Sequence, residues 1–430
     1  MEERKERIVV VGGGFAGLNL VKKLNKNKYD ITLIDSNNYH SFPPLFYQVA
    51  SAGLEPSSIS FPFRSEFRKK RYRNLTYNLG RVMSIDLTAK TILTEFETVE
   101  YDRLVIATGS ANNFFNSPEL VEVVYTLKST AEAIRCRNDI LDRLEQAAIC
   151  HDAAHRRRLL NFVVVGGGPA GVEVAGALGE MKRYILHRDY PSINKDEITI
   201  TLIEGSNRLL GAMSEKSSAA ALNFLKSLLV TPEFGMVMTD YSDGKITLSD
   251  GRIIDAGMVI WTAGVKGADI PTAGGELPKG RGNRIIVDGL NRVKGFDDVY
   301  AIGDICIMPD VDSDFPQGHP QLAQPAIQQG RNLAANLNAP ERKRLFKYKD
   351  NGSMATVGRN RAVVDLKHST FTGFFAWITW MFIHLISLLG MRNKVVVLFN
   401  WLWAYFSYGT ALRLLIHPSK YPLRKRWEKQ

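Results

Sequence analysis

The sequence IVVVGGGFAG occupies residues 8–17, and its first four residues form the β-branched, apolar run typical of a buried parallel strand. Gly12, Gly14 and Gly17 follow with GxGxxG spacing, and a helical pattern comes directly after them. In this context Gly12 permits a tight turn, Gly14 lets a pyrophosphate approach the backbone, and Gly17 lets the helix pack against the strand. The free N–H groups at the helix N-terminus favour phosphate. The segment therefore predicts a dinucleotide-binding turn.

An acidic residue stands where such a unit contacts the sugar of a nucleotide. The next predicted strand, Ile31–Ile34, ends at Asp35, eighteen positions after Gly17, where a carboxylate can accept hydrogen bonds from a ribose diol. Phe15 and Ala16, at the start of the helix, complete the residues expected around the pyrophosphate. A GxGxxG segment alone is weak evidence, but strand, turn, helix, second strand and acid together predict nucleotide binding.

The same pattern occurs a second time. FVVVGGGPAG occupies residues 162–171, and the strand predicted at Ile198–Ile203 ends next to Glu204. The nucleotide-binding residues expected in this copy are Gly166, Gly168, Pro169, Ala170, Gly171 and Glu204. Because an acid at the ribose position repels a 2′-phosphate, we expect NADH to be preferred over NADPH, although Arg208 lies four residues further on. The chain thus contains an internal repeat on the scale of a domain.

A later strand in each copy leads into a short polar corner. Leu104–Ala107 is followed by Thr108-Gly109, and Met258–Trp261 is followed by Thr262-Ala263-Gly264. We expect the two corners to border the nucleotides through Ala107, Thr108, Gly109, Ala263 and Gly264. Between the two copies, the polar stretch Thr130–Arg158 predicts a helix.

The net charge of the chain indicates either an anionic partner or a generally basic, solvated surface. Its 55 Lys and Arg residues against 44 Asp and Glu residues give a formal charge of +11, which suits nucleic acid, an anionic membrane or a phosphorylated ligand. The basic segment Arg64–Arg73 has only Tyr72 as an interleaved aromatic residue, and no nucleic-acid-binding motif accompanies it. We therefore expect no nucleic acid partner, because a phosphate-rich membrane surface accounts for the charge equally well.

The cysteine pattern excludes several kinds of chemistry. Cys136, Cys150 and Cys306 are widely separated, and no pair has CxxC spacing. No local cluster could hold zinc or an iron–sulfur centre, so we expect no metal site. An odd number of scattered cysteines suits a reducing compartment such as the cytosol.

Aromatic residues gather toward the end of the chain, in segments that lack charge. Five of the six tryptophans lie beyond residue 370: Trp377, Trp380, Trp401, Trp403 and Trp427. The runs Gly373–Gly390 and Val395–Leu412 contain no charged residue. As helices of such a length they would each reach about 27 Å, which is near the lower limit for spanning a bilayer.

Small and polar side chains cluster on one side of the first run, and they leave Trp377, Trp380 and Phe382 on the remainder. This pattern favours a helix that lies in the membrane interface with its narrow face against the protein. A membrane-spanning hairpin and a soluble dimerisation pair remain alternatives, and a homodimer stays open.

Two fingerprints in one chain suggest hydride transfer from a nicotinamide to a flavin. Residues 6–335 resemble the glutathione-reductase-like flavoproteins with two dinucleotide-binding domains, and VYAIGD at residues 299–304 matches the late flavin motif of that family. The resemblance implies that FAD is bound non-covalently and that NADH is a substrate. It also implies that Asp304 binds the ribityl chain of FAD and that Val82, after Gly80-Arg81, lies near the adenine.

Two further segments resemble the type II NADH:quinone oxidoreductases. AQPAIQQG at residues 323–330 is similar to the AQxAxQ segment of that family, and PLFYQVA at residues 44–50 is similar to its PLLYQVA stretch. The resemblance implies that Gln48, Gln324 and Gln328 approach a quinone, and that Ala323 and Gln324 also border the flavin. Gln324 and Gln328 share a helix face because they stand four residues apart. The alternative is that they support a helix near the flavin.

Glu173 is the expected catalytic residue. It follows the second glycine turn, and the resemblance implies that it places the nicotinamide or assists quinone protonation. An acid–base group suits the reaction, because reduction of a quinone to a quinol consumes two protons. The alternative is an acid near a helix start, which the helix dipole favours.

These observations predict an α/β fold with two Rossmann-like domains and a helical C-terminal segment. We expect a discontinuous FAD-binding domain (1–125 and 285–345), an NADH-binding domain (126–284) and a membrane-anchoring domain (346–430). The expected function is electron transfer from NADH through FAD to a membrane quinone without proton pumping. The expected location is peripheral, on the cytoplasmic face of the inner (cell) membrane, with the C-terminal helices on the bilayer surface.

Other functions on the same fold remain open from the sequence. A soluble ferredoxin or rubredoxin reductase would not need the apolar C-terminal segment. A sulfide:quinone oxidoreductase uses paired cysteines near the flavin, and Cys150 and Cys306 are poor candidates for such a pair. A flavin-bearing redox sensor that does not turn over is a further alternative.

Overall fold

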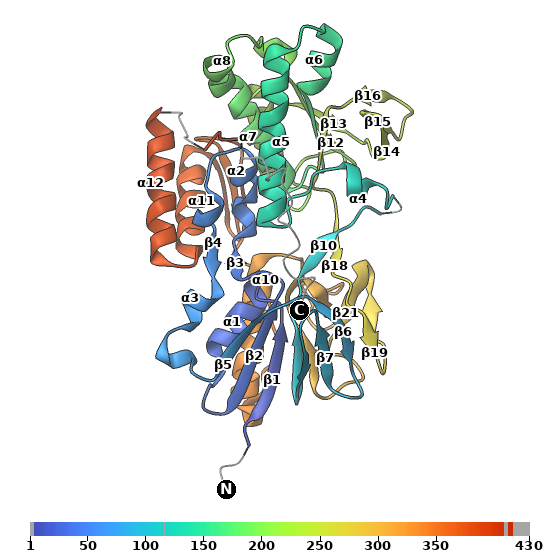
Figure 1. The fold of residues 1–430 in the computed structure, drawn as a ribbon, viewed down its shortest axis with the longest axis vertical. Coiled ribbons are helices and arrows are strands. Elements are labelled where there is room, and N and C mark those ends of the chain that lie inside the picture. The colour runs from blue at the N-terminus through green and yellow to red at the C-terminus, as the bar shows by residue number, and fades with distance from the viewer. Residues whose placement is uncertain (1–3, 116, 408–411, 416–430) are drawn as a thin grey trace, which may run out of the picture.

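The computed structural model describes residues 4–115, 117–407 and 412–415 of the chain. Its first unit is built on a five-stranded parallel sheet with the strand order β22-β9-β1-β2-β5 (Figure 1). These strands are β22 (Val299–Ala301), β9 (Arg103–Ile106), β1 (Glu6–Val11), β2 (Tyr29–Asp35) and β5 (Leu75–Leu79). The central strand β1 is buried on both faces from residue 8 to residue 11. This explains why it reads as an uninterrupted apolar run.

Two layers cover the faces of this sheet. On one face, α1 (Phe15–Lys23) packs against α10 (Ala323–Asn338) so closely that a Cβ on Gly330 would lie 2.3 Å from the Ala16 carbonyl oxygen. The other face packs against the sheet β19-β6-β7-β8, and Val9 and Ile85 belong to their common core. The strands of this second layer are β19 (Thr272–Ala273), β6 (Val82–Asp86), β7 (Thr91–Thr94) and β8 (Thr98–Glu100).

The second unit repeats the design. Its parallel sheet has the order β13-β12-β11-β17, with β13 (Thr231–Phe234), β12 (Thr199–Glu204), β11 (Asn161–Val165) and β17 (Met258–Trp261). Helices α5 (Thr130–Ile149), α7 (Pro169–Glu180) and α9 (Glu215–Ser227) share one core with it. The antiparallel strands β14 (Met238–Ser242), β15 (Lys245–Leu248) and β16 (Ile253–Asp255) share another. The predicted pair of Rossmann-like units is confirmed.

The polar stretch that was predicted as one helix over residues 130–158 forms two helices. α5 ends at Ile149, and α6 (Ala153–Leu159) begins after Asp152. The Asp152 carboxylate accepts hydrogen bonds from the N–H groups of Ala154 and His155 at 2.8 and 3.2 Å. Asp152 is therefore a helix N-cap with extended backbone, and this local hydrogen bonding interrupts the helical pattern.

The chain crosses between the two units twice, and the two crossings pair with each other. β10 (Ser110–Asn112) leads out of the first unit and pairs antiparallel with β18 (Val265–Gly267), which leads back. Beyond β18, strand β19 pairs with β6 of the first unit. We therefore place the return to the first unit near residue 265, within the range that the sequence assigned to the NADH-binding domain, and the domain limits remain a proposal.

A small sheet and two helices complete the described structure. β24 (Ser353–Thr356), β25 (Ala362–Leu366) and β26 (Ser369–Gly373) form an antiparallel sheet against α7 and α9. α11 (Phe374–Ser387) and α12 (Met391–Ser407) then lie side by side at the surface of the molecule (Figure 1). Among the described residues, no helix combines the length and the apolar character needed to cross a bilayer. Trp427 lies outside the described residues.

The face that α11 turns toward the protein differs from the prediction. Trp380 was expected to point away from the protein, but it is 1% exposed and stacks on His384 with ring centroids 4.0 Å apart. It also meets Tyr47 edge-on at 6.4 Å. Ser387 belongs to the small and polar side chains that the sequence placed against the protein, but it is exposed, whereas Phe382 is exposed as predicted. The helix thus buries one of its two tryptophans, because the indole fills space that small side chains would leave empty.

Shorter elements connect these layers. The remaining helices are α2 (Phe46–Ala50), α3 (Phe63–Phe67), α4 (Leu120–Val123) and α8 (Leu186–Asp189). The remaining strands are β3 (Tyr39–Ser41), β4 (Ser60–Pro62), β20 (Lys279–Gly280), β21 (Arg284–Ile286) and β23 (Cys306–Ile307). A π-helical turn, Met181–Ile185, continues α7.

Candidate functional site

The first glycine turn joins β1 to α1 and leaves an open space at the helix N-terminus. A Cβ on Gly12 would lie 2.3 Å from the Ala107 carbonyl oxygen, and a Cβ on Gly17 would lie 1.9 Å from the Gly12 carbonyl oxygen. A Cβ on Gly14 would meet no atom within 4 Å. The first two glycines therefore serve close packing, whereas Gly14 leaves room for a ligand where helix N–H groups favour phosphate.

The second glycine turn has the same geometry. A Cβ on Gly171 would lie 1.8 Å from the Gly166 carbonyl oxygen, and a Cβ on Gly168 would meet no atom within 4 Å. Pro169 occupies the first position of α7, where its missing N–H costs no helical hydrogen bond, and Ala170 follows it. Each turn thus offers one open position, at Gly14 and at Gly168.

The two predicted acids lie against their glycine turns. The Asp35 carboxylate accepts a hydrogen bond from the N–H of Gly13 at 2.6 Å, and the Glu204 carboxylate accepts one from the N–H of Gly167 at 2.5 Å. Each acid ends its strand, β2 or β12. Burial raises the pKa of the Asp35 carboxyl, and the hydrogen bond from Gly13 opposes the rise. Both carboxylates are therefore fixed beside the turn, as contact with a ribose diol requires.

The residues after β9 and β17 lie next to the turns. The N–H groups of Ala107 and Thr262 donate to the carbonyl groups of Val11 and Val165, both at 2.8 Å. The Thr108 hydroxyl is buried and finds no hydrogen-bond partner within the described part of the chain. Gly109 and Gly264 have φ values of +74° and +73°. Ala263 follows Thr262, and a Cβ added to Gly166 would lie 2.8 Å from the backbone nitrogen of Ala263.

Asp304 lies beside the first glycine turn. A Cβ on Gly303, which has a φ of +78°, would lie 3.0 Å from the Ala16 side chain. The Asp304 carboxylate accepts a hydrogen bond from the Ser110 hydroxyl at 2.9 Å, and that hydroxyl accepts one from Lys128 at 3.0 Å. Burial lowers the pKa of Lys128. Sequence reasoning missed Ser110 and Lys128, because no local pattern connects them with Asp304.

Three other predicted residues are placed around the same unit. Val82 opens β6 and packs against the core of the parallel sheet, two residues after Gly80, whose N–H donates to the Asp35 carbonyl at 2.9 Å. The Phe15 ring, at the start of α1, lies edge-on to His40 with centroids 5.5 Å apart. Ala323 is the first residue of α10.

Gln324 and Gln328 bind the backbone that precedes β24. Gln324 donates to the Gly352 carbonyl at 2.9 Å and accepts from the Asn351 N–H at 3.1 Å. Gln328 donates to the carbonyl of Lys349 at 2.8 Å and accepts from its N–H at 2.9 Å. Their shared face thus fastens α10 to residues 349–352. Among the described residues, neither amide shares a hydrogen bond with Gln48.

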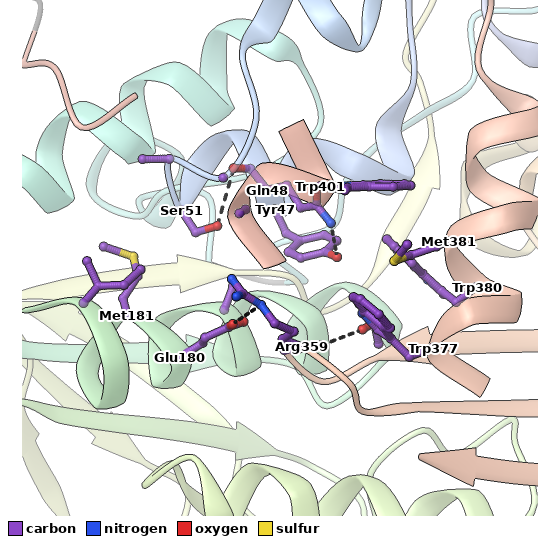
Figure 2. A pocket seen from close by; sticks show the side chains of 17 residues that line it. Tyr47, Gln48, Ser51, Glu180, Met181, Arg359, Trp377, Trp380, Met381 and Trp401 are labelled. Atoms are coloured by element: carbon purple, nitrogen blue, oxygen red, sulfur yellow. Dashed lines mark hydrogen bonds and ion pairs between the residues drawn. The ribbon is translucent and has the colours of Figure 1, made fainter. Parts of the chain in front are cut away.

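A cavity of about 130 Å³ lies between α2, α7, α11, α12 and the segment that follows β24 (Figure 2). Gln48 lines it, donates to the Tyr47 hydroxyl at 2.8 Å and accepts a hydrogen bond from the Trp401 indole at 2.8 Å. Its apolar lining includes Trp377 and Trp380. An apolar cavity with a few fixed polar groups is the usual form of a small-molecule site.

Glu173 lies behind the cavity, in α7. It is 7% exposed, and its carboxylate accepts a hydrogen bond from the Thr356 N–H at 3.4 Å. Burial raises the pKa of Glu173 from its ordinary value of 4.5 to about 8, and the contacts with Thr356 and Trp380 oppose the rise only in part. A carboxyl group with such a pKa can exchange a proton near neutral pH.

Glu180 and Arg359 also line the cavity, and sequence reasoning did not identify them. Arg359 Nε lies 3.2 Å from the Glu180 carboxylate, and the two side chains face each other in Figure 2. The spacing of Glu180 from Glu173, seven residues on one helix, is the signal that could have placed both acids on a common face.

The three cysteines form no disulfide bond. Cys136, Cys150 and Cys306 are free thiols, and Cys136 and Cys306 are buried. Burial raises the pKa of the Cys306 thiol to about 12, so this thiol is a poor nucleophile near neutral pH. No group of His, Cys, Asp and Glu residues that could hold a metal occurs within residues 4–115, 117–407 and 412–415.

Two dinucleotide-type turns, each on its own parallel sheet, define a pyridine-nucleotide oxidoreductase of the flavoprotein type. In agreement, residues 6–330 match the pyridine nucleotide-disulphide oxidoreductase family, and residues 351–407 match the NDH2 C-terminal domain. The chain is 33% identical over 427 residues to the type II NADH:quinone oxidoreductase Ndh of Mycobacterium tuberculosis, a match that covers 94% of this chain and 89% of that relative. The chain therefore belongs to the type II NADH:quinone oxidoreductases.

Further relatives agree with this family. The chain is 33% identical over 434 residues to the mitochondrial internal alternative NAD(P)H-ubiquinone oxidoreductase A1 of Solanum tuberosum, covering 93% of this chain and 86% of that protein. The fold is similar to that of NDH2 from Plasmodium falciparum solved in complex with NADH, with a TM-score of 0.87, 22% identity and coverage of 96% of this chain and 100% of that chain.

Proposed function

We propose that this NADH dehydrogenase holds FAD non-covalently in its first unit, oxidises NADH in its second unit and reduces a membrane quinone at the Gln48 cavity. The observation that carries the proposal is the pair of glycine turns, each with one open position beside a fixed carboxylate. A protein needs two such turns when two dinucleotides must meet.

The residues of the first unit fit FAD. Gly14 and the N-terminus of α1 leave space for the pyrophosphate, and Asp35 is placed for the adenosine ribose. The orphaned Thr108 hydroxyl and the Asp304 carboxylate offer polar groups for the rest of the molecule. Bound there, the flavin would supply a hydride acceptor and an electron donor. On this basis we propose that the other first-unit residues predicted from the sequence also border FAD. They include Phe15, Ala16, Gly17, Val82, Ala107, Gly109 and Ala323.

The residues of the second unit fit NADH. Gly168 leaves the space for the pyrophosphate at the N-terminus of α7, and Glu204 takes the ribose position. A carboxylate there disfavours the 2′-phosphate of NADPH. Arg208 donates to the Gly211 carbonyl at 2.6 Å, so its guanidinium is already engaged near the turn. Glu173 holds a proton at its buried carboxyl and serves as the acid–base residue of quinone reduction.

Quinone binding is proposed at the cavity around Gln48. A neutral amide can donate a hydrogen bond to a quinone carbonyl without burying a charge. Gln48 is held by Tyr47 and Trp401, and aromatic side chains line the path around it. The quinone roles of Gln324 and Gln328 stay a prediction, and their hydrogen bonds to residues 349–352 support the structural alternative for both.

The α11–α12 pair is proposed to rest on the bilayer surface. Phe375 is 76% exposed, Phe382 60% and Phe406 81%. Such side chains on helices too short to span fit a monotopic attachment, with the apolar side in the acyl boundary. We place the enzyme peripherally on the cytoplasmic face of the cell membrane, where NADH is available.

The test measures NADH oxidation by the purified protein with and without a short-chain quinone, together with its flavin content. We expect a fluorescent flavin that is released on denaturation and identified as FAD, and strong stimulation by the quinone. A variant truncated after residue 370 should keep its flavin and lose binding to vesicles. Absence of stimulation by the quinone, with rapid reduction of a ferredoxin instead, would refute the quinone assignment and leave the dinucleotide sites standing.

A further inference from the structure

Helix α7 carries a buried and a half-buried carboxylate, Glu173 and Glu180, on one face. Glu173 and Glu180 stand seven residues apart, which is close to two helical turns, so their side chains project in nearly the same direction. Glu180 lines the cavity, whereas Glu173 lies deeper. The π-helical turn Met181–Ile185 begins directly after Glu180, and such turns occur frequently at functional sites.

The segment after β24 holds both carboxylates. The Thr356 N–H donates to Glu173, and three residues later Arg359 forms the ion pair with Glu180 at 3.2 Å. Arg359 also donates to the Tyr405 carbonyl of α12 at 3.1 Å. One short segment thus fixes the spacing between the two acids and connects them to the helix pair that we place on the membrane.

Tyr47 faces both acids from α2. It lines the cavity with Glu180, and Figure 2 shows Tyr47 and Gln48 on the side of the cavity opposite Arg359 and Glu180. Burial raises the pKa of the Tyr47 phenol well above its ordinary value, and the charges of Glu173 and Glu180 add to the effect. A neutral phenol can accept a proton on its oxygen while it donates its own.

The reaction requires such a path, because the proposed function leaves one proton to be supplied. NADH releases two electrons and one proton in the form of a hydride. Conversion of a quinone to a quinol forms two O–H bonds and takes two electrons and two protons. The second proton must therefore come from water, and it must reach a cavity whose walls are largely apolar.

We propose that Glu180 is the proton-entry residue of the cavity, taking a proton from water at the Arg359 side and passing it, through the Tyr47 hydroxyl, toward Glu173 and the quinone oxygen. In each turnover the Glu173 O–H bond breaks as the quinone oxygen gains that proton. The Tyr47 hydroxyl then gives its proton to the Glu173 carboxylate while it takes the proton of Glu180. The Glu180 carboxylate finally takes a proton from bulk water. This inference rests on the proposed quinone function and goes beyond it by assigning a residue to proton delivery.

The charged groups around Glu180 set the pH at which the path works. Arg359 and Arg361 face it from the segment after β24, Tyr47 faces it from α2, and Glu173 lies on its own helix. Burial raises the pKa of the Glu180 carboxyl, and the two arginines oppose the rise. Proton delivery should therefore weaken as the pH rises through the pKa of Glu180, because the group is then an ionised carboxylate with no proton to give.

The experiment follows the two half-reactions of the full-length holoenzyme by anaerobic stopped flow between about pH 6 and pH 9. NADH first reduces the flavin, and a short-chain quinone or ferricyanide then reoxidises it. The variants are Glu180→Gln, Glu180→Asp and Tyr47→Phe. The control is Glu197→Gln, since Glu197 also pairs with an arginine (Arg156, 2.5 Å) but does not line the cavity.

Reoxidation of E180Q by quinone should slow at least about tenfold, while reduction by NADH and reoxidation by ferricyanide, which takes up no proton, stay unchanged. E180Q should also lose the pH-dependent fall of the wild-type quinone step, E180D should recover much of the rate, and E197Q should behave as wild type. The infrared difference spectrum of a pH titration should lose one carboxyl band in E180Q, with or without substrate.

Three results would overturn the assignment. One is wild-type quinone reoxidation and an unchanged pH profile in E180Q. Another is an equal loss in E180Q and E180D with the pH profile preserved, which would make the ion pair purely structural. If E180Q loses its flavin, wild-type quinone reoxidation in Y47F overturns the path instead. Failure of the wild-type protein itself to transfer electrons to quinone would refute the proposed function, which is a separate outcome.

Discussion

Asp35 and Glu204 make the same kind of hydrogen bond to their glycine turns, and we propose that each contacts the ribose of a different nucleotide. Each carboxylate uses one oxygen to accept the N–H of the middle glycine of its turn, and the other oxygen accepts an N–H two residues beyond the acid, from Asn37 or Ser206 at 2.7 Å. The side chains are therefore held in place before any ligand arrives, and the strong preference of such a site for an unmodified ribose follows from the fixed negative charge.

Glu204→Ala should relax the preference for NADH. Removing the carboxylate removes its repulsion of a 2′-phosphate, so the KM for NADPH should fall about tenfold or more while flavin content stays the same. Steady-state kinetics with both cofactors measure this change. Asp35→Ala is the matched variant, and it should instead lower flavin content and leave the ratio of NADH to NADPH activity unchanged. An unchanged NADPH KM in E204A would contradict the assigned ribose position.

Glu173→Gln should alter the pH dependence of stability. The folded protein holds the Glu173 proton up to about pH 8, whereas the unfolded chain releases it near 4.5. The contribution of the neutral carboxyl is therefore fully present below about pH 4.5 and is lost as the pH rises to about 8, by roughly 3–5 kcal/mol. Urea unfolding should show that E173Q gains stability relative to wild type across this range.

The control for this measurement is Glu341→Gln, because Glu341 is exposed and should shift stability equally at all pH values. A difference between wild type and E173Q that does not change with pH would mean that the Glu173 proton is not held by burial.

At the scale of elements, the two glycine turns make a matched pair for testing the assignment of the two units. Gly14 and Gly168 both have extended backbone with negative φ, −66° and −71°, and both have open space at the Cβ position. Alanine therefore fits each position without strain, and any loss of binding comes from the space that its methyl group takes from a ligand.

Gly14→Ala should bind flavin at least about tenfold more weakly. Gly168→Ala should keep its flavin and raise the KM for NADH at least about tenfold. Flavin absorbance and NADH kinetics measure the two effects. Gly171→Ala serves as the contrast: its Cβ would lie 1.8 Å from the Gly166 carbonyl, so it should lower the thermal stability. The opposite pattern, with flavin lost in G168A and retained in G14A, would mean that the second unit binds FAD and the first unit binds NADH.

The α11–α12 pair makes a prediction about membrane attachment. Phe375→Ser with Phe382→Ser removes two exposed rings, 76% and 60% accessible, without touching the buried Trp380. Burial of a phenylalanine side chain contributes about 2 kcal/mol, so binding to anionic vesicles should fall more than about tenfold while NADH oxidation with a soluble quinone is kept. The control is Phe96→Ser, which is 75% exposed on the first unit. Equal loss of vesicle binding in the control would place the membrane surface elsewhere.

At the scale of the whole molecule, the sequence predicted what is local and missed what the fold assembles. The glycine turns, the strands beside them and the two acids lie within short segments, and their geometry follows from the residue pattern. The Ser110–Lys128–Asp304 hydrogen bonds join residues up to 194 positions apart, and no period in the sequence encodes such a contact.

The cavity follows the same rule. Gln48 was predicted from a resemblance, but its hydrogen-bond partner Trp401 lies 353 residues away in the sequence. Arg359 contacts Glu180 of α7 from the turn between β24 and β25. The reversed orientation of Trp380 has a similar origin, because amphipathic patterns cannot tell which side of an aromatic-rich helix the protein will cover. The break at Asp152 is local, because its side chain caps α6, but an aspartate alone does not predict a break, since Asp139 and Asp142 lie within α5.

Gln324 and Gln328 matter to the assembly of the whole molecule. They join α10 of the first unit to the start of the C-terminal sheet, so Gln324→Leu with Gln328→Leu should lower the free energy of unfolding by about 2 kcal/mol or more through the lost hydrogen bonds. Thermal unfolding measures this loss, with Gln146→Leu on the surface of α5 as control. Unchanged stability with a raised KM for quinone would instead support a role of Gln324 and Gln328 in quinone binding.

The paired crossings β10 and β18 determine how the two units can move. Twisting one unit about the axis of this ribbon would shear the hydrogen bonds between residues 110–112 and 265–267, whereas bending the ribbon across its strands would leave them intact. We therefore expect the space between the two units to open and close by a hinge motion along one direction. A protease that cuts either strand would give two polypeptides, and the pairing of β9 with β22 in the first parallel sheet would hold them together without a covalent bond.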